Sequence, residues 1–248
     1  MSEKDTFPPT LEVGLSSLEA PSAARAIELI QLEIYGKAGL TLAASEIQKP
    51  DPRLPRGKVD FVLWKYNGTK PYPNFPAPTR PKVIEAVTKL ALTDYEMDIW
   101  WHKASIYARQ LTPDDLNDLL GVMVNPPARV APFTMWVWLQ RVQLAAAVLI
   151  ARLDSGWDGS VRRSALLSLA RGPMDWTVEA AILALYMVVS NDKVGKAEVE
   201  GVYRELFENL PSPGGVPYMQ ALILCTVFIK PSSPALVALA QKAIKQWG

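Results

Sequence analysis

FTMWVWLQRVQLAAAVLIARL, the stretch of residues 133–153, contains only two charged side chains, Arg141 and Arg152. Its apolar residues do not gather on one helical face but occur all around the helix. A helix of this kind is buried on all sides in a protein of this size. We therefore expect a helix over residues 133–153 to be the central core element, with the other helices packed around it.

Helical periodicity extends from residue 81 to the C-terminus and is broken by short turns rich in Pro and Gly. Pro81 suits the first turn of a helix. The tetrapeptide Thr112-Pro113-Asp114-Asp115 offers a capping hydroxyl, a proline at the first position and two acids at the positive helix end. Later helices are predicted over residues 160–170, 175–189, 196–210, 217–229 and 233–246. We expect an all-α protein with about nine or ten helices in one or two helical lobes.

Proline sets the organisation of the first third of the chain. Residues 1–20 contain Phe7-Pro8-Pro9 and are predicted to form an N-terminal arm. Residues 21–125 are predicted to form an N-terminal helical lobe, and residues 126–248 a C-terminal helical lobe. The N-terminal lobe includes a long Pro-rich loop at residues 49–81, where eight prolines exclude a helix.

Composition favours a folded protein of a reducing compartment. The hydrophobic share of 49% is enough for a core, and the charged share is 21%. A single cysteine, Cys225, cannot form an internal disulfide. No apolar run approaches the roughly 20 residues of a membrane span. We expect a soluble cytoplasmic protein, located in the host cytoplasm and the virion if it is viral.

The motifs of common enzymes are missing from the sequence. His102 is the only histidine, and no carboxylate or thiol near it in sequence suggests a catalytic dyad. No His or Cys cluster has metal-ligand spacing, and no Gly-rich phosphate loop or Gly-x-Ser-x-Gly turn occurs. We expect no catalytic residue, no metal and no cofactor, and therefore a binding or assembling protein rather than an enzyme.

A net charge of +1 conceals alternating blocks of charge. Residues 49–82 carry eight positive and two negative charges, interleaved with aromatic residues. Residues 126–174 carry six arginines and two acids. Arginine donates two hydrogen bonds to a phosphate at once, and aromatic rings stack on bases. The two basic blocks favour single-stranded RNA as a partner, although charge runs are also common on solvated surfaces.

The predicted RNA-binding residues fall in both basic blocks. They are Arg152, Arg162, Arg163 and Arg171 from the second block, and Lys58, Trp64, Lys65 and Tyr66 from the Pro-rich loop. Replacing Arg162 and Arg163 together by Ala is expected to weaken RNA binding without unfolding the protein. If the double variant binds RNA normally, the pair is only surface charge.

The N-terminal segment has the opposite charge. Residues 1–48 carry three positive and seven negative charges. An acidic arm of this kind can dock on a basic or apolar groove of a neighbouring subunit, in a head-to-tail contact. We therefore expect self-association through the N-terminal arm, and the alternative is a frayed terminus.

Two short motifs resemble viral structural proteins. The tail KPSSPALVALAQKA at residues 230–243, with the arm and the helical body, resembles the nucleoproteins of phenuivirus-like RNA viruses. That resemblance implies single-stranded RNA in a basic groove between two helical lobes, and assembly through the arm. Residues 111–120, LTPDDLNDLL, resemble the third helix of retroviral capsid N-terminal domains. Together they suggest a self-assembling structural protein of the viral nucleoprotein or capsid type.

A third motif suggests a different class. Residues 158–166, DGSVRRSAL, resemble the second half of a HEAT-type helical repeat. A stable solenoid needs at least three such units, and only this one is recognisable in the sequence. The alternative function is therefore a HEAT-like scaffold for protein–protein interaction.

Overall fold

The computed structural model describes residues 80–93, 96–124, 141–172, 176–209 and 218–247 of the 248 residues. Every regular element within these ranges is helical, which confirms the all-α fold class. The predicted N-terminal arm and nearly all of the Pro-rich loop lie outside the described residues.

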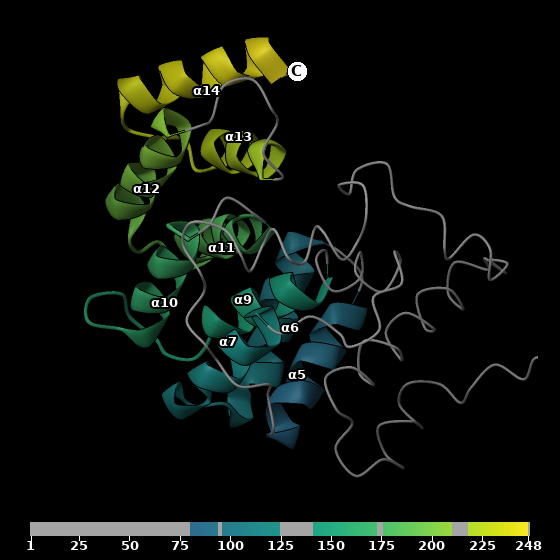
Figure 1. Cartoon of the computed structure of the whole chain (residues 1–248). Helices are drawn as coiled ribbons and strands as arrows, with labels where there is room; N and C mark the ends of the chain where they lie inside the picture. The colour runs from purple at the N-terminus through teal and green to yellow at the C-terminus, as the bar shows by residue number, and fades with distance from the viewer. Residues whose placement is uncertain (1–79, 94–95, 125–140, 173–175, 210–217, 248) are drawn as a thin grey trace, which may run out of the picture.

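Helices from the first half of the described chain pack around a short central helix, α9 (Figure 1). The surrounding helices are α5 (Pro81–Leu92), α6 (Met97–Tyr107) and α7 (Leu116–Val124). All eight residues of α9 (Gln143–Ile150) are buried. α9 is thus a core helix, as the apolar run predicts, but it ends at Ile150 rather than at residue 153. Residues 133–140 lie outside the described ranges.

From α9 onward the helices stack in pairs. The later helices are α10 (Val161–Ala170), α11 (Trp176–Met187), α12 (Lys196–Glu208), α13 (Met219–Phe228) and α14 (Pro234–Trp247). α11 packs against both α9 and α13, and α12 packs against both α10 and α14. Two rows result, α9–α11–α13 and α10–α12–α14, which can be followed upward in Figure 1. In helical-repeat proteins, too, each helix pair packs mainly against the pairs next to it.

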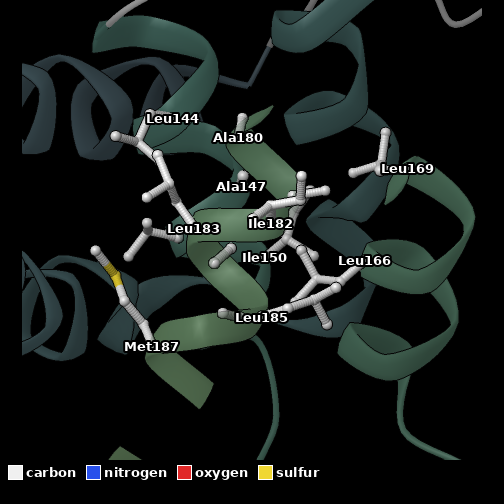
Figure 2. Packing of buried hydrophobic residues seen from close by; sticks show 14 of the residues in the cluster. Leu144, Ala147, Ile150, Leu166, Leu169, Ala180, Ile182, Leu183, Leu185 and Met187 are labelled. Carbon is white, nitrogen blue, oxygen red and sulfur yellow. The ribbon is translucent and has the colours of Figure 1, made fainter. Parts of the chain in front are cut away.

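The first interface of this stack is almost purely apolar. Leu144 and Ile150 of α9 face Leu183 and Leu185 of α11, and Leu166 of α10 closes the side (Figure 2). Alanines at positions 145–147, 180, 181 and 184 are buried in the same cluster, and their small side chains let the helix axes approach closely.

The chain turns sharply after α11, at a segment that contains Asp192 and Gly195. The π-helical segment Val188–Asp192 continues α11, and the chain then reverses through Lys193 and Gly195, both with positive φ. A Cβ atom at Gly195 would overlap the indole ring of Trp157. Only glycine therefore fits both the backbone conformation and the space at this position.

The buried apolar residues form one cluster that spans the predicted lobe boundary at residues 125 and 126. α9 belongs to the predicted C-terminal lobe, yet it packs against α5, α6 and α7 of the predicted N-terminal lobe. The division of the chain into lobes stays a prediction.

A buried carboxylate connects the start of α5 to the turn before α7. The expected cap at Thr112 is present, because Asp115 accepts a 2.8 Å hydrogen bond from the Thr112 N–H. The Asp115 side chain is fully buried and pairs with Arg80 at 2.5 Å and Lys82 at 2.6 Å. Burial alone would raise the pKa of Asp115, but the hydrogen bonds from Lys82, Arg80 and Thr112 hold this pKa at about 2.

We predict that Asp115→Asn lowers the free energy of unfolding by about 2–4 kcal/mol, because two cations lose their shared partner. The pKa of Asp115 lies below its ordinary value of 3.8, so the stabilisation is complete above that pH. It is lost as the pH falls toward about 2. Urea unfolding of both proteins across this range measures the effect, with Asp114→Asn at an exposed position as the control. Parallel stability curves for the parent and Asp115→Asn would contradict this account.

Candidate interaction surface

Arg162 is a core residue. Only 2% of its side chain is exposed. Its guanidinium donates to the carbonyls of Gly156 at 2.6 Å and Ala151 at 3.1 Å, and to Asp192 at 2.5 Å. The predicted phosphate-binding role of Arg162 is not supported by this geometry, because protein oxygens already surround the group away from solvent. Arg162 instead holds the turn after α9 against the end of the π-helical segment.

Arg152 shares an acidic partner with Arg162. Its Nη1 lies 3.5 Å from Asp192, and its guanidinium lies over the ring of Trp101 at 4.6 Å from the ring centroid. A cation held over an aromatic face is stabilised by the quadrupole of the ring. Arg152 therefore links α6 to the end of the π-helical segment in addition to pairing with Asp192.

Arg163 and Arg171 lie together on the surface formed by α10 and α12. Arg163 donates to both carboxylate oxygens of Glu198 at 2.8 and 2.7 Å. Arg171 does the same to Glu205 at 2.8 and 3.3 Å. These side-chain hydrogen bonds lower the pKa of each glutamate. Arg163 remains 34% exposed and Arg171 45% exposed, so a phosphate could reach them only by competing with the two glutamates.

A surface cleft of about 480 Å³ lies beside the Arg171–Glu205 pair. The ends of α10 and α12 line it, with Leu206 and Asn209 among the lining residues. Thus the fold brings Arg152 and Arg162 to one acid, and Arg163 and Arg171 to one surface. The other predicted site residues, Lys58, Trp64, Lys65 and Tyr66, lie outside the described residues.

The strongest unassigned feature is an exposed apolar stripe on α13. Leu224, Val227 and Phe228 are exposed by 51%, 49% and 53%. They follow i, i+3, i+4 spacing and therefore share one face of the helix. Of the five large apolar side chains most exposed in the described ranges, four belong to α13 and α14. The fourth is Ile244, and the fifth is Ile99 of α6.

The stripe continues onto α11. The Tyr186 and Phe228 rings lie 6.1 Å apart at an angle of 49°. Such tilted aromatic contacts are favourable. We call Tyr186, Leu224, Val227 and Phe228 the α11–α13 face. It lies on the row formed by α9, α11 and α13.

Ionisable groups between α11 and α13 are strongly desolvated. Burial raises the pKa of Glu179 on α11 to about 7. Burial, together with the nearby charge of Glu179, raises the pKa of the Cys225 thiol on α13 to about 12. Cys225 therefore stays an uncharged, buried thiol, as expected for a small core residue.

The last helix pair of the described chain and its connecting turn are basic. Residues 218–247 contain Lys230, Lys242 and Lys245 and no Asp or Glu. All three lysines are exposed, and their ammonium groups form no ion pair with a described residue. The other basic groups discussed above are partly neutralised by acids of the fold. Residues 218–247 therefore contribute a net charge of +3 of their own.

The sequence of α13 is unusually apolar, but its periodicity does not predict an exposed face. α13, MQALILCTVF, is apolar on all sides and has no charged residue. Such a helix is normally buried on all sides. Only the tertiary arrangement shows which of its faces the described residues leave uncovered.

The remaining candidates of the sequence are unremarkable in position. His102 is exposed on α6 and Cys225 is buried. Within the described ranges, no group of three or more His, Cys, Asp or Glu residues is placed to hold a metal ion. Among the described helices, none is both long enough and apolar enough to cross a bilayer.

Comparison with protein-family models, curated proteins and solved structures finds no match. Function is therefore inferred from the geometry of the described residues.

We predict that Arg162→Ala and Arg163→Ala differ sharply in their effect on folding. Arg162→Ala should lower the free energy of unfolding by about 3–5 kcal/mol, because it removes the shared donor of the Ala151 and Gly156 carbonyls and leaves Asp192 with only its 3.5 Å contact to Arg152. Arg163→Ala breaks a partly exposed pair and should cost at most about 1 kcal/mol. Urea unfolding followed by circular dichroism measures both. Equal losses would show that burial does not distinguish the two arginines. The expected result means that replacing both residues destabilises the fold as well as removing surface charge.

Proposed function

We propose that this chain is a helical scaffold that binds a protein partner through the α11–α13 face. The observation that carries the proposal is the half-exposed stripe of Leu224, Val227 and Phe228 on a helix without charge. Three consecutive helix pairs support it further, because stacked pairs present extended surfaces for binding. The HEAT-type resemblance of residues 158–166 agrees with this layout, and these residues span the start of α10.

The size of the stripe sets what kind of complex it can form. Covering the exposed half of each of these three side chains contributes about 1 kcal/mol apiece. Association itself costs several kcal/mol in lost freedom of motion. The stripe is therefore an anchor within a larger contact, and the surrounding polar and charged groups have to contribute as well.

Site-specific photo-cross-linking in the producing cell tests this function. A photoreactive phenylalanine analogue is placed at Val227 of the full chain, and at Ile99 in a matched control. One predominant adduct at position 227 and none at position 99 is expected. If neither position yields an adduct, the α11–α13 face has no resident partner and the scaffold function fails.

We propose a second function, which is single-stranded RNA binding by a self-assembling structural protein of the nucleoprotein or capsid type. Arg163 and Arg171 favour it, because both are partly exposed and lie on one surface. Residues 49–82 add eight positive charges among aromatic residues, although only positions 80–82 are described. Assembly through the acidic N-terminal arm and a location in the host cytoplasm and virion belong to the same proposal.

RNA binding is predicted to be tight at low salt and to weaken steeply as salt rises, by the release of counterions from phosphates. Fluorescence anisotropy with a labelled single strand at about 50 and 200 mM salt measures it. Arg163→Gln with Arg171→Gln should reduce the salt slope, whereas Arg204→Gln, which changes an exposed arginine on the neighbouring helix α12, should not. Absence of binding at the lower salt concentration would exclude this function.

A further inference from the structure

We infer that the contact between α11 and α13 is a pH-sensitive contact of the helical stack, and that the carboxyl group of Glu179 controls it. The neutral carboxyl group keeps the two helices together, and the ionised group favours their separation. This inference goes beyond the scaffold function proposed above and does not rest on it, because the contact needs no partner in order to open.

Two pairs of residues place Glu179 at this contact. α11 and α13 pack side by side (Figure 1). Tyr186 lies seven residues after Glu179, so both share one face of α11, and the Tyr186 ring contacts the Phe228 ring of α13. Cys225 lies three residues before Phe228, and its thiol is close enough to Glu179 for a carboxylate charge to raise the thiol pKa. The side of α11 that carries Glu179 is therefore directed toward α13.

The contact offers no partner to an ionised Glu179. The side chain is mostly buried, and it forms no hydrogen bond or ion pair with a described residue. The only titratable residue of α13 is Cys225, which is fully buried. α9, on another side of α11, has no titratable residue at all. A carboxylate at this position would thus be both desolvated and unpaired.

The other elements packed against α11 do not offset this charge. Burial is the one cause of the raised pKa of Glu179, so no charged group of these elements contributes to it. The charged residues of α10 and of the π-helical segment are Arg162, Arg163 and Asp192. The titratable residues of α12 are Lys196, Glu198, Glu200, Tyr203, Arg204, Glu205 and Glu208.

The direction of the pH effect follows from the raised pKa. Glu179 has its ordinary pKa of 4.5 when it is exposed, and burial raises this pKa to about 7 in the folded chain. The stabilisation by the neutral group is therefore complete below pH 4.5 and is lost as the pH rises to about 7. At higher pH a buried, unpaired charge favours opening. Opening also separates Tyr186 from Phe228, so alkaline conditions should disrupt the α11–α13 face.

Cys225 reports on the contact, because it is the only cysteine of the chain and is fully buried. A thiol reagent reaches it only when the contact opens. The full chain and Glu179→Gln are labelled without denaturant at about pH 5.5 and about pH 8, and the adduct is measured by mass spectrometry. An exposed thiol gains reactivity with pH equally in both proteins. The ratio of the parent rate to the variant rate should therefore rise about thirtyfold between these pH values.

Glu208→Gln is the matched control, since Glu208 is an exposed glutamate of the neighbouring helix α12. This variant should be labelled at the parent rate at both pH values. Circular dichroism under the same conditions should show that most of the helical signal is retained at about pH 8, because α13 separates from α11 while the core around α9 stays folded.

Amide hydrogen exchange of the parent chain tests the contact without any substitution. After correction for the intrinsic exchange rate, the protection of α13 relative to α5 should fall at least about tenfold between pH 5.5 and pH 8. α5 packs against α9 rather than against α13 and is therefore the internal reference.

Three results would overturn the inference. The first is a ratio of labelling rates that does not change with pH, and the second is an unchanged relative protection of α13. The third is loss of the whole helical signal together with labelling at about pH 8, which would identify global unfolding instead of a local opening. None of these results bears on the photo-adduct expected at Val227 under conditions where the contact is closed, so the scaffold function can fail or stand separately.

Discussion

Complete burial of α9 is the constraint on which the rest of the fold depends. Its eight residues carry no charge, and all of them are buried. A helix of this kind must be enclosed on every side, and α5, α6, α7, α10 and α11 do so. Because α11 is buried against α9 on one side and receives α13 on another, enclosure of the core also starts the stack of helix pairs. The exposed stripe of α13 lies at the last pair of that stack in the described chain.

The arginines show that charges which the sequence suggests are free for ligand binding can be paired within the fold. Residues 126–174 carry an excess of four positive charges, and three acids from the following segment neutralise much of it. These acids are Asp192, Glu198 and Glu205, each of which pairs with an arginine of that block. An arginine that is buried as deeply as Arg162 needs such a partner, since an unpaired charge in the core is very costly. Lys230, Lys242 and Lys245 differ from these arginines. The sequence did not mark them as a basic block, yet none of them pairs with an acid among the described residues.

Local signals predicted the helices well. Pro81 begins α5, Thr112 caps the turn before α7, and Ser160 caps α10 by accepting from the N–H of Arg163. Such signals act over one helical turn and can be recognised without knowledge of the fold. Thr93 follows the end of α5, and α6 begins at Met97. The Trp100 indole N–H donates a hydrogen bond to the Thr93 carbonyl. This contact depends on the tertiary structure and cannot be predicted from helix propensity.

The sequence by itself determined the helical class, most helix limits and the identity of the core helix, because these follow from periodicity, capping and apolar content. Only the tertiary structure decided which arginines are buried, which acids neutralise them and which side of α13 the described residues leave exposed. The partners of Arg162 and Arg163 are 30 and 35 residues away in sequence, and no local pattern specifies such pairs. Burial and electrostatic pairing depend on which helices pack together. The packing of other helices around the buried helix α9 determines much of that arrangement.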